Sequence, residues 1–539
     1  MPHNIWPSLA YLAAIAYLPV AYATAKAAAG GRWRNITFLR AVSKDFLRTF
    51  PATALAWTPV FLFPSAAKWY VLAIHAVFAP LAIFELVHIK YFGARVGVNT
   101  FYSIFVTNAQ EVRDYVRQQM TFLNIVVLLL VYAAPMPLIA LYMPNASFDA
   151  QWVRWTLAAA SLVAFIPFPR NLTKKGSRFK ISYVLNPYSN MIYHWFVFKR
   201  SYGELKRNIA AHSAPPFAKI TSSMPEGTKE TYIIAIGESA NAQHHSYCGY
   251  KRNTNEFTDA LGDSMRRFRG VRSQFAQTLP SLEKTLTFAD CKNPDKLWTQ
   301  GSMIDYFKEA GFKTFWLSNQ YALDDTAITA MAGHADEMKC FNFGDMKRFE
   351  RTGLDGEMIP EIEKAIADEA PRKAIFVHLI GSHAAYVNRY PAEFRHFEGA
   401  APGKEHLSAM KNQMINTYDD SIRYTDYVIS KIAQSLDAAE GVSFLLYFGD
   451  HGEDIYDTRE DKPLGHSQLA NEPMTSVPFM LWTNAAYRKA RPDVARRTAK
   501  ASYRLEDAIH SVIDFASLSN PDFDIGRSIL EPESGGKNA

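Results

Sequence analysis

Acidic and histidine residues directly follow short apolar runs in the C-terminal two thirds of the chain. Glu238 comes just after Tyr232–Ile236, and Asp450 and His451 come just after Phe444–Phe448. The carboxyl ends of parallel strands meet at one edge of a sheet, so these three side chains should lie together there. A mixed set of carboxylate and imidazole ligands suits Zn²⁺ and tolerates Mn²⁺. Each residue alone is typical of a turn or a helix cap, but together they predict a metal site.

Two more apolar runs deliver polar residues to the same edge. Ala374–Leu379 is followed by His383, and Thr314–Leu317 is followed by Asn319. His383 and a later histidine, His466, could hold either a second metal ion or a phosphate group. The alternation of such runs with helical patterns predicts an α/β domain with a mostly parallel sheet.

A candidate nucleophile lies in Arg272–Phe288, where Thr278 stands between a short extended stretch and a helix that Ser281 could cap. Backbone N–H groups at a helix N-terminus can hold a phosphate, and a metal ion can lower the pKa of a hydroxyl group next to it. Thr278 is therefore a candidate nucleophile that would also bind the metal. The alternative, which the sequence pattern by itself favours, is that Thr278 only caps the helix.

The N-terminal third of the chain is strongly apolar. A transmembrane helix needs about 20 mostly apolar residues, and five segments of this region approach or reach that length. We interpret residues 1–170 as a transmembrane domain whose first helix is an anchor and not a cleaved signal peptide. The candidate spans are Trp6–Ala25, Thr49–Pro64, Trp69–His88, Phe122–Tyr142 and Trp152–Phe168.

Residues 99–120, between the third and fourth spans, have the pattern of an amphipathic helix at the membrane surface. Apolar residues recur there at helical spacing, and Ser103, Thr107 and Glu111 share another face because they are four residues apart. The simpler interpretation is that these three residues form an ordinary solvated face.

Charge and cysteine content exclude some classes of protein. The net charge of +6 is small, and the chain has neither a basic patch with interleaved aromatic residues nor zinc-finger spacing, so nucleic acid is not an expected partner. The three cysteines are too few and odd in number for a disulfide framework, and Cys291–Cys340 is the favoured pair if one bridge forms. The other expected divisions are a bridging segment and linker at 171–228, a catalytic domain at 229–532 and a disordered tail at 533–539.

The first loop of the apolar region carries an excess of basic residues. The positive-inside rule places such a loop in the cytoplasm, and five spans would then place the catalytic domain in the cytoplasm as well. The basic residues of this loop are Lys26, Arg32, Arg34, Arg40, Lys44 and Arg48.

Several segments resemble the membrane phosphoethanolamine transferases of Gram-negative bacteria, whose catalytic domain has the alkaline phosphatase/sulfatase fold. They cover most of Glu230–Pro532 in the order expected for that family. The segments from Leu286 and Tyr447 are most similar to the subgroup that modifies the heptose core of lipopolysaccharide, whereas lipid A-modifying members carry several cysteine pairs. The matching segments are IGESANAQHHSYCGYKRNTNEF from Ile236, LTFADCKNPDKLWTQ from Leu286, AGFKTFWLSNQ from Ala310, HLIGSH from His378, YFGDHGEDIYDT from Tyr447 and VPFMLWT from Val477.

The resemblance implies roles for the candidate residues. Glu238, Asp450 and His451 match the family's metal ligands, for which zinc is usual, and Thr278 matches the threonine nucleophile. The second group is implied to bind a second metal or the substrates. It consists of His383, which matches a histidine for the donor phosphate or a second zinc, His466, which is displaced from the family position, and the lipid-donor contacts Ser103, Thr107, Glu111 and Asn319.

The resemblance also implies the architecture and the location. The expected fold is an N-terminal five-helix transmembrane bundle plus an α/β/α catalytic domain of alkaline phosphatase/sulfatase type. In this family the protein lies in the bacterial inner membrane with the catalytic domain in the periplasm. That orientation contradicts the basic first loop, and we follow the family because its donor and acceptor both lie outside the cytoplasm.

The reaction implied by the resemblance has two displacement steps. Thr278 attacks the phosphorus of phosphatidylethanolamine, diacylglycerol leaves, and a sugar hydroxyl or phosphate of a lipopolysaccharide acceptor then takes the phosphoethanolamine group from the threonine. The expected acceptor is the core heptose, with lipid A as a second choice, and the expected state is a monomer. The alternatives are a glycerol-phosphate transferase of lipoteichoic acid synthase type and an inactive membrane scaffold.

Overall fold

The computed structural model divides the chain into two compact units, an N-terminal unit within residues 1–202 and a C-terminal unit that contains residues 203–539. The division falls inside the bridging segment expected at 171–228, although the limits of that segment stay a prediction. The structure describes residues 2–29, 36–92, 96–97, 100–101, 122–165, 194–200, 203, 217–321, 326–342, 353–460, 463 and 470–532.

Helices occur in all five apolar segments that the sequence marks as candidate spans. Within the described residues, Trp6–Ala25 and Pro64–Lys90 are long and apolar enough to cross a membrane, so a count of five spans stays a prediction. The fourth segment is interrupted at Ala134, because Pro135 has no N–H group to donate to the preceding turn. The elements of this unit are β1 (Pro2–His3), α1 (Trp6–Ala29), α2 (Ile36–Leu62), α3 (Ala67–Phe92), α6 (Phe122–Ala133), α7 (Pro135–Tyr142), β2 (Ser147–Phe148) and α8 (Gln151–Phe165).

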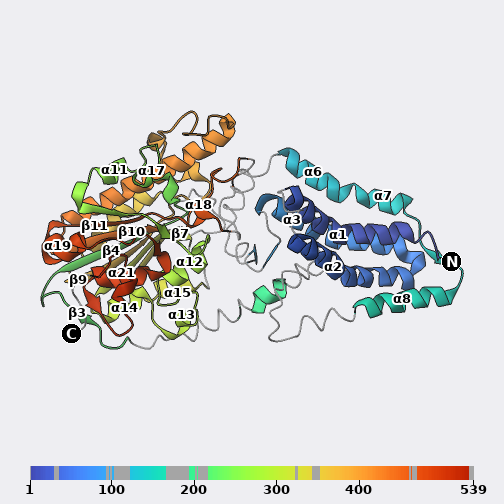
Figure 1. The fold of residues 1–539 in the computed structure, drawn as a ribbon, viewed down its shortest axis with the longest axis horizontal. Helices are drawn as coiled ribbons and strands as arrows, with labels where there is room; N and C mark the ends of the chain where they lie inside the picture. Colours follow the sequence, from blue (N-terminus) through green and yellow to red (C-terminus); the bar gives the residue numbers. More distant parts are fainter. Residues whose placement is uncertain are drawn as a thin grey trace. The chain divides into compact units, whose positions relative to one another are not determined.

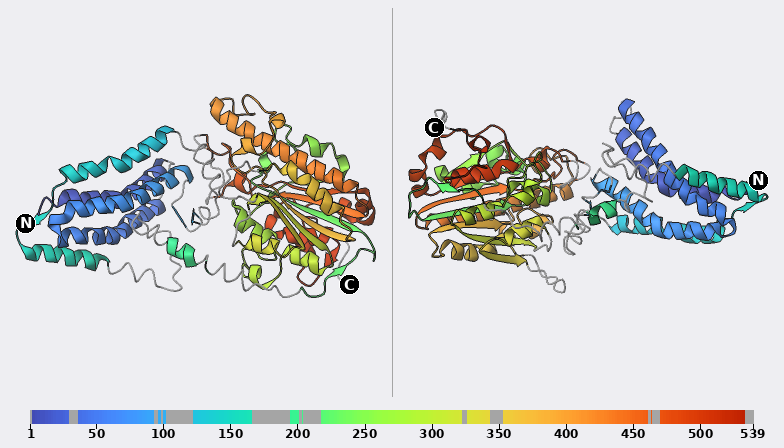
Figure 2. Two further views of the ribbon diagram at one scale, coloured as in Figure 1. Left: turned by 180° about the vertical axis from the view of Figure 1, so that it is seen from behind. Right: turned by 90° about the horizontal axis from the view of Figure 1, so that it is seen from below.

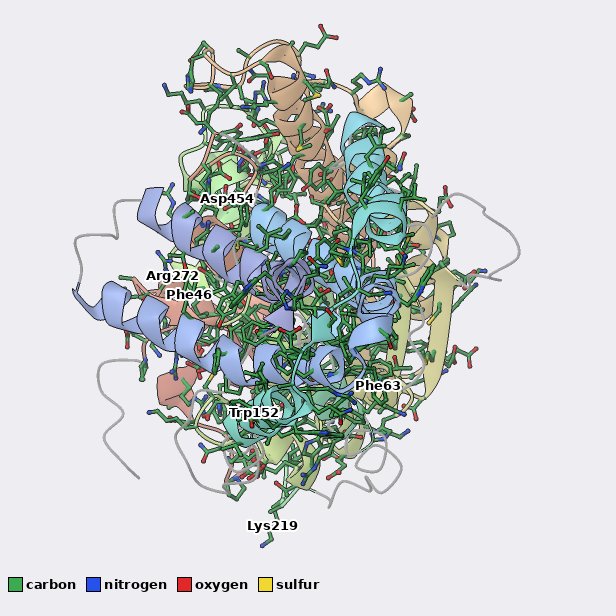
Figure 3. The ribbon with its side chains drawn as sticks, turned by 90° about the vertical axis from the view of Figure 1, so that its right-hand side faces the viewer. Phe46, Phe63, Trp152, Lys219, Arg272 and Asp454 are labelled. Atoms are coloured by element: carbon green, nitrogen blue, oxygen red, sulfur yellow. The ribbon has the colours of Figure 1, made fainter. Side chains whose placement is uncertain are left out.

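Polar side chains connect the helices of the N-terminal unit, while its exterior is apolar. The hydroxyl group of Tyr11 on α1 lies 2.8 Å from Nδ1 of His75 on α3. The hydroxyl groups of Thr58 on α2 and Ser161 on α8 lie 2.8 Å apart. The side chain of Trp152, by contrast, is 71% exposed (Figure 3). Interhelical hydrogen bonds behind an apolar surface are typical of helices that pack in a bilayer.

The C-terminal unit is built around a seven-stranded sheet with the order β5-β11-β10-β4-β9-β7-β8. Strands β10, β4, β9, β7 and β8 run parallel, whereas β11 pairs antiparallel with β10 and with β5. Gly237 at the end of β4 pairs with Gly449 at the end of β10, so both strands end together. The strands are β4 (Glu230–Gly237), β5 (Met265–Phe268), β7 (Lys313–Tyr321), β8 (Glu337–Asn342), β9 (Arg372–His378), β10 (Val442–Gly449) and β11 (Phe479–Thr483).

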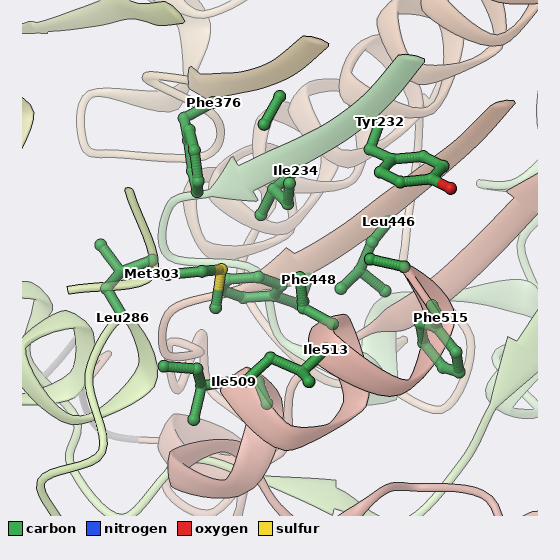
Figure 4. Packing of buried hydrophobic residues seen from close by; sticks show 14 of the residues in the cluster. Tyr232, Ile234, Leu286, Met303, Phe376, Leu446, Phe448, Ile509, Ile513 and Phe515 are labelled. Carbon is green, nitrogen blue, oxygen red and sulfur yellow. The ribbon is translucent and has the colours of Figure 1, made fainter. Parts of the chain in front are cut away.

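Alternate residues of the central strands pack on opposite faces of this sheet. On one face, Tyr232, Ile234 and Ile236 of β4 pack with α12, α14, α15 and α21 (Figure 4). On the other face, Ile233 and Ala235 pack with α16 and the long α17. Figures 1 and 2 show the sheet between these two layers of helices. The helices are α11 (Glu256–Asp259), α12 (Thr278–Thr285), α13 (Lys296–Thr299), α14 (Met303–Glu309), α15 (Ala327–Ala332), α16 (Ile359–Ile366), α17 (Ala409–Asp437), α18 (Glu472–Thr475), α19 (Ala485–Ala490), α20 (Pro492–Arg496) and α21 (Ala508–Phe515).

Two small sheets lie beside the main one. Strand β3 (Thr221–Ser222) pairs antiparallel with β13 (Leu518–Ser519), and β6 (Val271–Arg272) pairs parallel with β12 (Tyr503–Arg504). Strand β6 brings the chain back to the sheet a few residues before α12, the helix that carries the candidate nucleophile.

The disulfide bridge favoured from the sequence, between Cys291 and Cys340, is wrong. All three cysteines are free thiols. Cys340 is buried within strand β8, whereas Cys291 is exposed in the loop after α12, so the two side chains occupy different environments and do not meet.

Some of the expectations lie outside the described residues, and they stay predictions. They are the interfacial helix at 99–120 except for residues 100–101, the residues Ser103, Thr107, Glu111 and His466, and the tail at 533–539.

Candidate metal centre

Three buried side chains meet at the carboxyl edge of the main sheet. Ligand atoms of Glu238, Asp450 and His451 all lie within 4.8 Å of one another. Nε2 of His451 lies 3.3 Å from Oε1 of Glu238 and 3.5 Å from Oδ2 of Asp450. The sequence placed these residues after two separate apolar runs, and the parallel pairing of β4 with β10 brings the two strand ends together.

The turn after β4 aims Glu238 into the cluster. Ser239 has a left-handed backbone with φ of 56°, a conformation that is costly for a residue other than glycine and that is typical of functional sites. The hydroxyl group of Ser239 donates a 2.7 Å hydrogen bond to Oε1 of Glu238. The loop after β9 passes so close that a Cβ atom on Gly381 would lie 2.7 Å from the carbonyl oxygen of Glu238. The backbone on both sides of Glu238 is therefore tightly held.

The carboxylate of Asp450 has one oxygen that is fixed and one that is open. Oδ1 accepts hydrogen bonds from the backbone N–H groups of Ser239 at 3.1 Å and of His451 at 2.7 Å. Oδ2 is buried and has no hydrogen-bond donor among the described residues. A buried acceptor without a donor is costly unless another group binds it. An open carboxylate oxygen next to a second carboxylate and an imidazole fits a divalent cation.

The charges of the cluster perturb one another strongly. Burial and the nearby Glu238 charge raise the pKa of Asp450 to about 7. Burial opposes ionisation of Glu238 as well, but its hydrogen bond to His451 and the charge of that residue hold its pKa well below the usual range. Burial alone would lower the pKa of His451, yet the Asp450 and Glu238 carboxylates raise it to about 10. A cation bound here would take the place of the proton on the imidazole.

The hydroxyl group of Thr278 lies at the same cluster. Its Oγ1 donates a 3.0 Å hydrogen bond to Oε2 of Glu238 and lies 3.3 Å from Nε2 of His451. Thr278 is the first residue of α12, and no side chain caps that first turn. The expectation that Ser281 caps the helix is wrong, because Ser281 lies inside α12 and its hydroxyl group donates to the carbonyl oxygen of Asp450 at 2.7 Å.

His383 lies in the loop after β9, close to the cluster but not in it. The backbone N–H group of the preceding residue, Ser382, donates to the carbonyl oxygen of Glu238 at 3.0 Å. The charge of His383 contributes to lowering the pKa of Glu238. Nδ1 of His383 lies 2.9 Å from the carbonyl oxygen of Ala384. Its expected role in binding phosphate or a second metal stays a prediction.

Strand β7 contributes Gln320, which the sequence analysis did not select. The side-chain amide of Gln320 donates to Oε2 of Glu238 at 3.2 Å and to the carbonyl oxygen of Leu379 at 2.9 Å. The neighbouring Asn319 is fully buried and donates to Asp355 at 2.8 Å. Alternation of side chains along a strand is the signal that separates the two residues. The expected substrate contact of Asn319 stays a prediction.

The sulfatase family model matches residues 230–518. The chain belongs to the sulfatase family. Phosphoethanolamine transferase EptC of Escherichia coli strain K12 is 28% identical to this chain over 499 residues, which cover 88% of this chain and 84% of that protein. Phosphoethanolamine transferase CptA of Salmonella typhimurium is 29% identical over 495 residues, with the same coverage of 88% and 84%.

Solved structures show the same sulfatase fold. The periplasmic domain of EptC from Escherichia coli, in a complex with Zn, is 30% identical with a TM-score of 0.55, and the match covers 60% of this chain and 92% of that domain. The integral membrane protein lipooligosaccharide phosphoethanolamine transferase A from Neisseria meningitidis has a TM-score of 0.70 at 19% identity, over 97% of this chain and 98% of that one. The second likeness extends the shared fold beyond the sulfatase domain to the helical unit.

Proposed function

We propose that this sulfatase-family protein is a membrane phosphoethanolamine transferase that modifies an envelope glycan. The observation that carries the proposal is the position of Thr278 Oγ1 within hydrogen-bond distance of both Glu238 and His451. Relatives named phosphoethanolamine transferases align with 88% of the chain, including the helical unit. The donor is phosphatidylethanolamine and the acceptor is lipopolysaccharide or lipooligosaccharide, at a heptose of the core in preference to lipid A.

Zinc is the ion that we propose for the centre, because the periplasmic domain of a relative, EptC from Escherichia coli, was solved in a complex with Zn. Glu238, Asp450, His451 and the hydroxyl group of Thr278 would hold it. When bound, it would supply a Lewis acid that lowers the pKa of the threonine hydroxyl group and stabilises charge on phosphate oxygens.

The residues around Thr278 prepare it as a nucleophile. Oε2 of Glu238 already accepts the hydroxyl hydrogen, and this hydrogen bond holds Oγ1 at the cluster in position to attack. Nδ1 of His451 donates a 3.0 Å hydrogen bond to the carbonyl oxygen of Gly452, which leaves Nε2 facing the cluster. The uncapped first turn of α12 presents backbone N–H groups where the phosphate oxygens would lie.

The proposed reaction has two balanced displacements at phosphorus. In the first, a bond forms between Oγ1 of Thr278 and phosphorus, the bond to the glycerol oxygen breaks, and diacylglycerol leaves with the proton. In the second, an acceptor hydroxyl group or phosphate forms the new bond to phosphorus and the threonine oxygen recovers a proton. The residues proposed to hold donor or phosphate are His383, His466, Ser103, Thr107, Glu111 and Asn319.

The proposed setting is the bacterial inner membrane, with five spans and the catalytic unit in the periplasm. Periplasmic-domain relatives and the fold shared with an integral membrane protein support this orientation. The basic first loop then lies on the outer side, where its charges can bind anionic lipid headgroups. A cysteine-accessibility scan that places this loop in the cytoplasm would contradict the orientation.

Mass spectrometry of the peptide that contains Thr278 tests the donor and the nucleophile together. Detergent-purified protein is incubated with phosphatidylethanolamine, with and without a chelator, and a Thr278→Ala variant serves as the control. We expect a phosphoethanolamine adduct on Thr278 that the chelator prevents. An adduct formed from phosphatidylglycerol instead would establish a glycerol-phosphate transferase, and metal-loaded protein that forms neither adduct nor product would support an inactive scaffold.

A further inference from the structure

A cavity of about 410 Å³ lies in the surface of the catalytic unit near the metal centre. Its wall includes three basic residues, Lys251, Arg269 and Arg272, and one acidic residue, Glu472. Ser476 also lines this wall. The cavity therefore has an excess of positive charge, and nothing in the proposed chemistry at Thr278 uses it.

Strand directions place this cavity at the catalytic edge of the sheet. β5 is antiparallel to β11, which is antiparallel to β10, so β5 and β10 point the same way. Arg269 directly follows the end of β5, just as Asp450 directly follows the end of β10. Ligands of open α/β sheets bind beyond the carboxyl ends of the strands.

A thin layer of backbone separates the cavity from the loop that carries the metal ligands. The N–H group of Ala242, in the cavity wall, donates to the carbonyl oxygen of Ser476 at 3.0 Å. A Cβ atom on Gly452, the residue after His451, would lie 3.1 Å from that same carbonyl oxygen. A molecule in the cavity thus lies one layer of chain away from the metal centre.

The basic side chains of the cavity are available for a ligand. Lys251 and Arg269 are exposed, and within the described residues neither donates a hydrogen bond nor forms an ion pair. Arg272 is also exposed, and its guanidinium group lies 2.5 Å from the Glu472 carboxylate.

A second basic cavity lies at the opposite edge of the sheet, and its arginine side chains are bonded to other groups of the protein. Its arginines include Arg266, which donates to the carbonyl oxygen of Arg497 at 2.6 Å, and Arg491, which pairs with Asp493 at 2.8 Å. Arg488 donates to the carbonyl oxygen of Thr483. These guanidinium groups are used in holding the fold, whereas Lys251 and Arg269 are not.

We propose that the cavity around Lys251 and Arg269 is the subsite for an anionic group of the acceptor glycan, either a sugar phosphate or a sugar carboxylate. This rests on the proposed function, since it concerns the substrate of the second displacement. A glycan anchored by such a group next to the metal loop would present a neighbouring hydroxyl group to the phosphoethanolamine group on Thr278. The Lys251 and Arg269 side chains suit the binding of such a glycan, because Lys and Arg side chains bind phosphate and carboxylate groups.

The test separates acceptor binding from donor chemistry. Lys251→Ala, Arg269→Ala and the double variant are compared with Lys489→Ala, an exposed lysine of α19 at the opposite edge of the sheet. Binding of lipopolysaccharide that carries the core heptose is measured in detergent without turnover, and diacylglycerol release from phosphatidylethanolamine is measured without acceptor. We expect the dissociation constant for lipopolysaccharide to rise about three-fold in each single variant and about ten-fold in the double variant.

The outcomes distinguish the subsite from the proposed function. We expect donor cleavage to stay unchanged in all variants and the KM for lipopolysaccharide to rise with its dissociation constant. Added salt should weaken lipopolysaccharide binding by the wild type more than binding by the double variant. Lipopolysaccharide binding that is unchanged in the double variant, or equally weakened in Lys489→Ala, overturns the subsite. Absent donor cleavage in metal-loaded wild type contradicts the proposed function instead, and the binding assay still decides whether the cavity holds the glycan.

Discussion

The catalytic unit contains two buried clusters of the same residue types, and they differ in how completely their atoms are bonded. The metal centre comprises Glu238, Asp450, His451 and Thr278. A second cluster, which we call the closed cluster, comprises His244, Asp419, Asp457, Arg252 and Tyr250. Both combine carboxylates with an imidazole, and the two share the segments that follow β4 and β10.

In the closed cluster every charge faces an opposite one. Nδ1 of His244 lies 2.6 Å from Oδ1 of Asp419, and Nε2 lies 3.1 Å from Oδ1 of Asp457. The second oxygen of Asp419 accepts hydrogen bonds from Arg252 at 2.6 Å and Tyr250 at 2.7 Å. In the metal centre, by contrast, Oδ2 of Asp450 has no donor among the described residues. The closed cluster holds two loops together, and the open one is prepared to bind a cation.

The largest effect that the comparison predicts is the loss of catalysis when Thr278 is replaced. Thr278→Ala removes the oxygen that would form the bond to phosphorus, so we expect transfer of labelled phosphoethanolamine to fall by at least about 10³-fold. Thr278→Ser keeps a hydroxyl group and should retain measurable transfer. Metal content should stay near that of the wild type, because three other ligands remain. Transfer by Thr278→Ala above about one per cent of wild type, on the same scale, would be incompatible with a threonine nucleophile.

The closed cluster should matter for stability and not for chemistry. His244→Gln removes the cation that Asp419 and Asp457 share; Arg252 still pairs with Asp419, so we expect a cost of up to about 3–5 kcal/mol, the usual range for a broken buried ion pair. We expect a clear fall in the melting temperature of the full-length protein, measured in detergent, with the metal content per folded molecule unchanged. A His244→Gln variant that is as stable as wild type, or that is folded but empty of metal, would mean that the two clusters are not separate in function.

The metal centre should show the reverse response. Asp450→Asn removes the charge of the open carboxylate, and we expect metal affinity, measured against a competing chelator, to fall more than about 100-fold. The metal-free protein should not be destabilised by this change, because the amide carries no charge to repel Glu238. Asp419→Asn is the matched control, with a lower melting temperature and normal metal affinity. Equal losses of metal in the two variants would show that the closed cluster also supports the metal site.

The sequence predicted the open cluster better than the closed one, for a physical reason. Strand ends are visible in a sequence, because a buried apolar run that stops at Glu238 or at Asp450 marks the edge where ligands bind. His244 lies six residues after Glu238 and does not directly follow an apolar run, so the sequence gives no such signal for it. Its partner Asp419 lies on α17, far along the chain, and a buried ion pair across such a separation leaves no local pattern.

A similar limit explains the other differences. Gln320 and Asn319 are adjacent on β7, so their side chains point to opposite faces of the sheet. Which of the two reaches Glu238 depends on which face each one occupies, and the sequence does not show this. The number of cysteines allowed one bridge, and Cys291–Cys340 was the favoured pair, but the sequence holds no information about the distance between the two thiols in space. Residue types and strand ends were therefore predictable, whereas side-chain direction and partners across the chain were not.

The smallest predicted effect is a dependence of stability on pH that belongs to the closed cluster. Burial alone would lower the pKa of His244, but the charges of Asp457 and Asp419 raise it to about 10. Between the unfolded pKa of about 6.5 and this folded value, the folded protein binds more protons than the unfolded one. The stabilisation is therefore complete below pH 6.5 and is lost as the pH rises towards 10, by up to about 1.4 kcal/mol per pH unit.

Thermal unfolding of metal-saturated protein at pH 6 and pH 8 measures this dependence. The protein is saturated with metal because, without a bound cation, the raised pKa of His451 would give stability the same kind of pH dependence as His244 does. We expect the wild type to be less stable at pH 8 and His244→Gln, though less stable overall, to lose much less between the two values. An equal loss in both proteins would assign the pH dependence to other groups and would leave the closed cluster without a charged histidine. A loss confined to the wild type would show that a buried imidazolium, and not a bound metal, holds these two loops together.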